Sequence, residues 1–95
     1  MENLIEVKDK FNKIIYLSKE RWKHINEDHP EIAGYLKWFE LVLKNPTKVA
    51  SNSLDAKVKY FYRYLKDEKK YLLIIVKYLN GKGFIISSYL IRKIQ

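Results

Sequence analysis

Hydrophobic and polar positions divide the chain into segments with two different periods. Two short strands are predicted at Leu4–Val7 and Lys13–Leu17, joined by the polar turn Lys8–Asn12. A first helix is expected over residues 19–28, with Ser18 as its N-cap. Pro30 should end this helix, because the residue before a proline disfavours helical geometry.

A second helix is predicted over Glu31–Leu43, where apolar residues recur at helical spacing and give one apolar stripe. Asn45-Pro46 is a clear stop signal for this helix. The residues of the stripe are Ile32, Leu36, Phe39 and Leu43.

The second half of the chain has the period of strands. Asn80-Gly81-Lys82-Gly83 is a hairpin turn signal, because Asn-Gly readily adopts the positive backbone dihedrals of such turns. The order of elements predicts an α+β fold, with helices packed on one face of an antiparallel meander of three or four strands. The expected strands are Lys48–Ser51, Lys57–Leu65, Tyr71–Leu79 and Phe84–Ile91.

Composition narrows the class of protein. The 95 residues suffice for one domain, expected over residues 1–95, and carry a formal net charge of +8. Such a charge attracts polyanions, and nucleic acid is the commonest one in a cell. The chain has no cysteine, which excludes disulfides and thiolate metal sites. No apolar run is long enough to span a bilayer, so we expect a cytoplasmic protein without a membrane partner.

The two histidines of the chain, His24 and His29, both belong to the first helical segment. Histidine suits proton transfer near neutral pH. Arg21, His24 and Asp28 share one helical face, whereas His29 would point about 140° away unless the break before Pro30 turns it back. Two surface histidines without a catalytic role are an equally good interpretation, and a metal cluster of His24, Asp28 and His29 matches no strong motif.

Cations and hydroxyls on the later strands could bind a phosphate. Lys59 and Arg63 share a face of one strand, and Lys77 lies on the next. Ser87 and Tyr89 share a face of the final strand, with Ser88 on the other. The same cations could equally form a solvated sheet face. The tyrosine stripe opposite Lys59 could stack nucleic-acid bases, but packing beneath the helices is the favoured interpretation; its members are Tyr60, Tyr62 and Tyr64.

An ordered set of short motifs resembles a known superfamily. His24-Ile25, His29-Pro30-Glu31, Asn45-Pro46, Val76-Lys77 and Ser87-Ser88-Tyr89 follow one another along most of the chain. No one of them is specific alone. Together they resemble the phage-type nuclease domains of the barnase–EndoU–colicin E5/D–RelE superfamily.

This resemblance implies two N-terminal helices packed on a four-stranded antiparallel sheet, as in microbial ribonucleases and RelE-like toxins. It implies a toxin-like, metal-independent endoribonuclease that needs no cofactor. It also implies partners, namely RNA and an acidic antitoxin or immunity protein. By position, the implied catalytic residues are His24, His29, Lys59, Arg63 and Ser87, and the implied substrate-binding residues are Arg21, Lys77 and Tyr89.

Two other functions fit the same residues. One is a nucleic-acid-binding module that does not cleave, in which phosphate contacts alone explain the charge. The other is an interaction domain whose basic face docks an acidic protein. The nuclease hypothesis requires imidazole and cationic side chains to meet around one groove.

Overall fold

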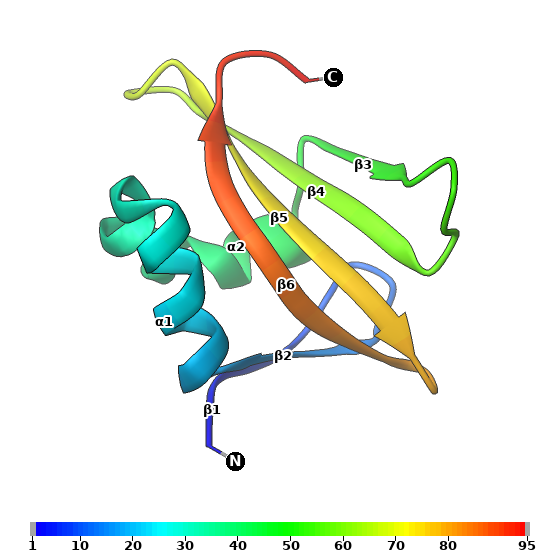
Figure 1. Ribbon diagram of the computed structural model, residues 1–95. Helices are drawn as coiled ribbons and strands as arrows, with labels where there is room; N and C mark the ends of the chain where they lie inside the picture. The colour runs from blue at the N-terminus through cyan, green and yellow to red at the C-terminus, as the bar shows by residue number, and fades with distance from the viewer. Residues whose placement is uncertain (1, 95) are drawn as a thin grey trace.

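The computed structural model describes residues 2–94 and contains one six-stranded sheet with helices on one side (Figure 1). The strand order is β1-β2-β6-β5-β4-β3. All neighbouring strands are antiparallel except β2 and β6, which run parallel. The strands are β1 (Asn3–Lys8), β2 (Ile14–Ser18), β3 (Lys48–Ser51), β4 (Val58–Leu65), β5 (Lys70–Leu79) and β6 (Lys82–Ile91).

The expected four-stranded antiparallel sheet is therefore wrong. The N-terminal hairpin does not stand apart from the meander, because β2 pairs in parallel with β6 through Ile15↔Gly83 and Tyr16↔Phe84. This pairing covers the edge that β6 would otherwise expose, and it carries Ile15 and Leu17 into the core, where both are fully buried. The result is a single mixed sheet of six strands.

The helical segment has three parts: α1 (Lys19–Asp28), a 3-10 helix η1 (Pro30–Trp38) and α2 (Phe39–Lys44). Ser18 caps α1 as predicted, since its hydroxyl accepts the Arg21 N–H at 3.0 Å. The second predicted helix is α-helical only in its last turns. Its first eight residues belong to the tighter 3-10 helix that begins at Pro30.

Side chains from the helices and from one face of the sheet form the core. Each buried aliphatic or aromatic side chain contributes about 1.5–3 kcal/mol through the area removed from water. The helical layer supplies Ile25, Ile32, Phe39, Val42 and Leu43, and the strands supply Ile15, Leu17, Phe61, Leu65, Leu72, Ile74, Val76 and Ile85.

The other face of the sheet carries no helix, and we call it the open face. Residues paired across neighbouring strands point to the same side, so the register assigns each residue to a face. The tyrosine stripe of β4 lies here, and its expected packing beneath the helices is wrong, because Phe61 and Leu65 take that side instead. The open face comprises Val58, Tyr60, Tyr62, Tyr64, Tyr71, Leu73, Ile75, Lys77, Phe84, Ser87, Tyr89, Ile91 and, on β2, Tyr16.

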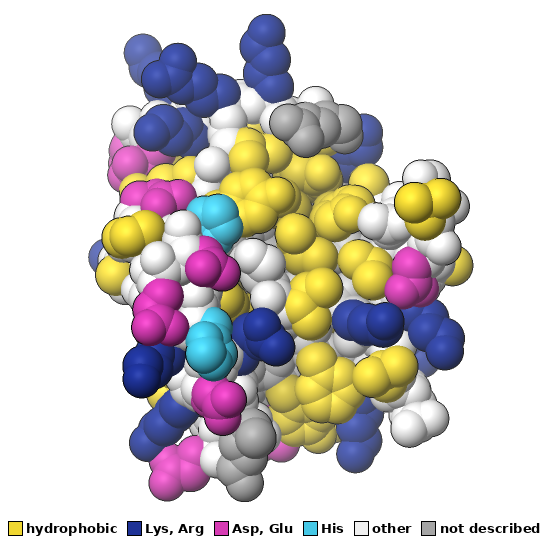
Figure 2. All heavy atoms as spheres, viewed as in Figure 1, with side chains coloured by type: hydrophobic (Ala, Val, Ile, Leu, Met, Phe, Trp, Pro, Cys, Tyr) yellow, Lys and Arg dark blue, Asp and Glu magenta, His cyan; other side chains and the backbone are white. Residues whose placement is uncertain are grey.

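Figure 2 shows hydrophobic side chains gathered over the middle of the sheet, with the histidines along the border on the side of α1. In residues 2–94, no helix is long and apolar enough to cross a membrane.

Candidate nucleic-acid interface

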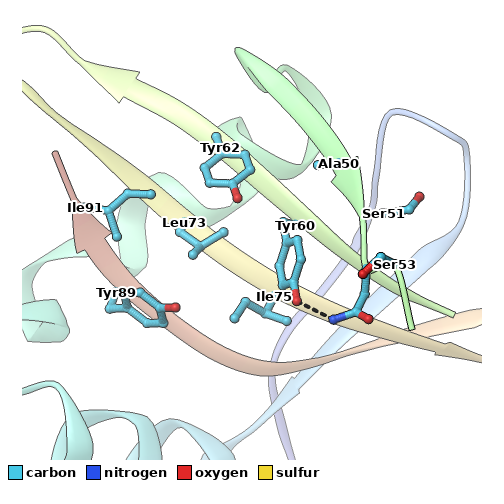
Figure 3. A pocket seen from close by; sticks show the side chains of 10 residues that line it. Ala50, Ser51, Ser53, Tyr60, Tyr62, Leu73, Ile75, Tyr89 and Ile91 are labelled. Carbon is cyan, nitrogen blue, oxygen red and sulfur yellow. Dashed lines mark hydrogen bonds between the residues drawn. The ribbon is translucent and has the colours of Figure 1, made fainter. Parts of the chain in front are cut away.

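A hollow of about 330 Å³ lies on the open face between β3, β4 and the end of β6. Its size falls in the range of small-ligand sites. Asn52 lines it, and its side-chain amide donates to the Tyr60 hydroxyl at 2.6 Å, drawn as the dashed line in Figure 3. The hollow is lined by Ala50, Ser51, Asn52, Ser53, Tyr60, Tyr62, Leu73, Ile75, Tyr89 and Ile91.

Tyrosine hydroxyls meet in this hollow. Tyr62 is 4% exposed, and burial raises its pKa above the ordinary value, with smaller contributions from Tyr60 and Tyr89. Its hydroxyl therefore stays protonated at neutral pH and remains a hydrogen-bond donor. An aromatic wall with such donors can stack a base and also bind a polar edge.

His29 lies at the border of this hollow because α1 ends there. It is the C-cap residue of α1, with φ −136° and ψ 76°, and the chain turns at this point into η1. The imidazole stacks on the ring of Tyr89, with centroids 4.7 Å apart and planes 27° apart. The side chain is 33% exposed, and its Nδ1 lies 3.9 Å from a Glu31 oxygen. The break before Pro30 thus brings His29 onto the open face, and a proton acceptor reaches the aromatic surface.

Ser87 and Lys77 point to the same face as Tyr89. Ser87 pairs with Ile75, Tyr89 with Leu73, and Lys77 with Phe84. Ser87 and Tyr89 are two residues apart on one strand, which separates their Cα atoms by about 7 Å. The four residues His29, Lys77, Ser87 and Tyr89 therefore share one surface.

A β-bulge sets this arrangement on β6. The register shifts between the pairs Ile75↔Ser87 and Val76↔Ile85, so Ile86 is the extra residue. Without it, Phe84 and Ser87 would point to opposite sides. Beyond the bulge, Ser88 turns into the core and donates to the Leu73 carbonyl at 2.7 Å.

Lys59 and Arg63 do not join this surface. Lys77 pairs with Val58, whereas Lys59 pairs with Val76 of the core, so the two lysines lie on opposite faces. Arg63 also lies on the helix side, where it donates to the Asn45 carbonyl at 2.7 Å. The expected grip of a phosphate by Lys59, Arg63 and Lys77 together is therefore not formed.

Arg21 and His24, on α1, lie apart from the group formed by His29, Lys77, Ser87 and Tyr89. His24 is 54% exposed, and its ring nitrogens lie 3.7 Å from Glu20 and 3.3 Å from Glu27. Arg21 lines a hollow of about 360 Å³ at the end of the open face nearest α1. This hollow includes Tyr16 and Phe84, whose rings stack with centroids 5.6 Å apart.

Sequence reasoning missed the groups that flank Lys77 and the hollow. The Lys77 ammonium lies 3.3 Å from an Asp55 oxygen, and Asn52 orders the loop that carries Asp55 by accepting its N–H at 3.0 Å. The pKa of Asp55 is lowered, first by the Lys57 N–H and then by Lys77. The residues of this loop, Asn52–Ala56, are typical of a turn, but turn composition does not reveal which strand a loop covers.

Within residues 2–94, no three histidine, aspartate or glutamate side chains are grouped so that they could hold a metal ion. No family model, curated protein or solved structure matches the chain. The likeness to the nuclease superfamily therefore rests on the ordered sequence motifs alone.

Proposed function

We propose that the protein is a metal-independent endoribonuclease that binds single-stranded RNA on its open face. The observation that carries this proposal is the stack of His29 on Tyr89, on the same face of the sheet as Ser87 and Lys77. Four of the eight residues expected from the sequence share this surface. Such a protein would act in the cytoplasm as a toxin, held in check by an acidic antitoxin or immunity protein.

The open face supplies both parts of RNA recognition. Base stacking on aromatic side chains is worth about 1–3 kcal/mol per base and tolerates any sequence. Tyr60 offers such a ring in the hollow, and the Lys77 ammonium attracts the phosphate backbone. A strand bound in this way would place a ribose near His29.

The proposed chemistry is transesterification. The His29 imidazole takes the proton of a ribose 2′-OH, the 2′-oxygen bonds to the adjacent phosphorus, and the bond from phosphorus to the 5′-oxygen breaks. The Tyr89 phenol donates a proton to the leaving oxygen and regains one from the His29 imidazolium. The Ser87 hydroxyl donates a hydrogen bond to the charged oxygens of the phosphorane, and Lys77 binds a phosphate further along the RNA strand. The products are a 2′,3′-cyclic phosphate and a 5′-hydroxyl.

The test compares the two histidines under metal-free conditions. Wild type, His29→Ala and His24→Ala are incubated with mixed RNA and EDTA, and the 3′ ends are mapped. His29→Ala should lose about 10²–10⁴-fold in rate, the usual contribution of one acid or base. His24→Ala is the matched control and should retain most activity. DNA should survive, because it lacks the 2′-hydroxyl.

Three results would overturn this mechanism. Cleavage of DNA or complete inhibition by EDTA would indicate a different reaction. If His29→Ala cleaved RNA at the wild-type rate and His24→Ala lost activity, the catalytic site would instead lie on the outer face of α1.

A second candidate function is RNA binding without cleavage. It is favoured by the separation of Lys59 and Arg63 from the open face and by the pairing of Lys77 with Asp55. In that case RNA would bind with a Kd that depends on Tyr60, no 2′,3′-cyclic ends would form, and His29→Ala would bind RNA as well as wild type. An acidic partner competing with RNA for the open face is compatible with either function.

A further inference from the structure

A third hollow lies on the helix side of the sheet, at the end where β4 begins and β5 finishes. Its volume is about 520 Å³, and the turn after β1 and the β5–β6 turn both contribute to it. Phe11 lines it and is 44% exposed. Lys13, Lys57 and Lys59 line it as well. An exposed aromatic ring among amino groups is a combination suited to a nucleotide, which has a base to stack and a phosphate to pair.

The amino groups around this hollow are not neutralised. Lys13, Lys57 and Lys59 form no ion pair with any carboxylate in residues 2–94. The Lys59 ammonium lies instead 5.2 Å from the centroid of the Phe11 ring, and that of Lys10 lies 5.6 Å from it. Such cation–π contacts offset little of the repulsion between like charges at an exposed site.

The nearby carboxylate of Asp9 is already engaged. One oxygen accepts the backbone N–H groups of Phe11 and Lys13 at 2.8 and 3.0 Å, and the other accepts the Tyr78 hydroxyl at 2.5 Å. Asp9 is 5% exposed and shapes the turn that presents Phe11. Asp9 forms no ion pair with the lysines of the hollow, which leaves their ammonium groups able to pair with phosphates.

The hollow is connected to the open face by a short path around the end of the sheet. Lys77 lies on the open face, and its strand neighbour Tyr78 donates its backbone N–H to the Lys57 carbonyl at 2.8 Å. Lys57 and Lys59 then continue on the other side. The two faces of a sheet are separated by roughly the 10 Å of one packed layer, which a few nucleotides can span. Figure 2 shows Lys and Arg side chains gathered at this end, in the lower right of the view.

We propose that the Phe11 hollow is a second nucleotide-binding site, which takes the part of an RNA strand that leaves the open face past Lys77. This assignment rests on the proposed binding of RNA to the open face. A base would stack on Phe11, and Lys13 and Lys59 would pair with phosphates. The ligand chemistry is that of a nucleoside phosphate, whose source is the RNA strand and not a free nucleotide.

The experiment uses two uncleavable 2′-O-methyl oligouridylates with a fluorescent label, one of about four nucleotides and one of about twelve. Fluorescence anisotropy gives Kd at several salt concentrations for the full chain and for Lys13→Gln/Lys59→Gln. The matched control is Lys23→Gln/Lys37→Gln, which removes the same charge from exposed helical positions. Uridine monophosphate is titrated as a separate probe.

The double variant should bind the long oligonucleotide at least about fivefold more weakly, with a salt slope reduced by about 1.4, since each phosphate contact on a single strand contributes about 0.7. It should bind the short oligonucleotide like wild type. Equal losses in the control variant, or equal losses for both lengths, would overturn the second site.

Binding of uridine monophosphate that is lost in Lys13→Gln/Lys59→Gln, with the long oligonucleotide unaffected, would overturn the assignment to an RNA strand. If the open face did not bind RNA, the binding data would differ from those expected for a missing second site. The short oligonucleotide would then not bind wild type at all, whereas a defect confined to the long one reports on the Phe11 hollow.

Discussion

Gly83 is the residue at which the parallel pairing of β2 with β6 can be tested by one added methyl group. A Cβ at this position would lie 2.3 Å from Ile15 Cδ1, 2.8 Å from Val76 Cγ1 and 3.2 Å from Tyr78 Cε2. Ile15 and Val76 are both 0% exposed, so neither side chain can swing into solvent. Gly83→Ala should therefore strain the core.

The magnitude follows from two opposing effects. Overpacking a close-packed core costs about 1–3 kcal/mol. Replacing glycine by alanine in a compatible backbone returns about 0.4–1 kcal/mol through the unfolded state. We expect Gly83→Ala to lower the free energy of unfolding by about 1–2 kcal/mol, which urea denaturation would report as a lower midpoint with an unchanged m-value.

A second substitution, at Ile15, tests whether the new methyl group meets the Ile15 side chain. Ile15→Val removes the Cδ1 atom that the new methyl would meet, and alone it should cost about 0.5–1.5 kcal/mol. In the Gly83→Ala background it should cost less or stabilise, so the double-mutant cycle should show favourable coupling. Additive effects, or a Gly83→Ala protein as stable as wild type, would mean that β2 does not bring Ile15 against Gly83.

Two further predictions concern buried and paired polar groups. Burial and the Asp9 hydrogen bond raise the pKa of Tyr78 above 10.0, so the unfolded phenol ionises first and stability falls as the pH rises above about 10. Tyr78→Phe should reduce that slope by up to about 1.4 kcal/mol per pH unit in alkaline denaturation, and an unchanged slope would contradict the burial argument. Asp55→Asn should free Lys77 for phosphate and tighten RNA binding by up to about fivefold at low salt, because exposed ion pairs are worth at most about 1 kcal/mol. Weaker binding would instead assign Asp55 a role in ordering the site.

Local features of the chain were predictable because they depend on neighbours in sequence. The Asn80-Gly81 turn adopts positive φ values of 54° and 80°, as its residues predict. The Ser18 cap also forms as predicted. These signals need no knowledge of the rest of the chain.

The pairing of β2 with β6 was not predictable, because it joins segments far apart in sequence and no local pattern selects a strand's partner. The side of the tyrosine stripe was equally ambiguous. Alternation separates Tyr60 and Tyr62 from Phe61, but both sets are aromatic, so the pattern does not say which faces the helices.

The candidate site was predictable in part for related reasons. Helical spacing alone turned His29 away from His24, and only the backbone break before Pro30 brings its ring onto Tyr89. The sequence places the cations Lys59 and Lys77 on adjacent strands. In the structure Lys59 pairs with Val76 and not with Lys77, and this offset of one residue puts the two lysines on opposite faces. A shift this small changes the face without changing any motif.

The claim that the open face binds RNA is tested most directly by a nuclear magnetic resonance titration with the 2′-O-methyl oligonucleotide of about four nucleotides. Saturable shifts should appear at His29, Tyr62, Ser87 and Tyr89, while exposed Lys23 and Lys37 on the helical layer stay unchanged. Saturable shifts confined to the helical layer, with the open-face residues unchanged at saturation, would contradict the account.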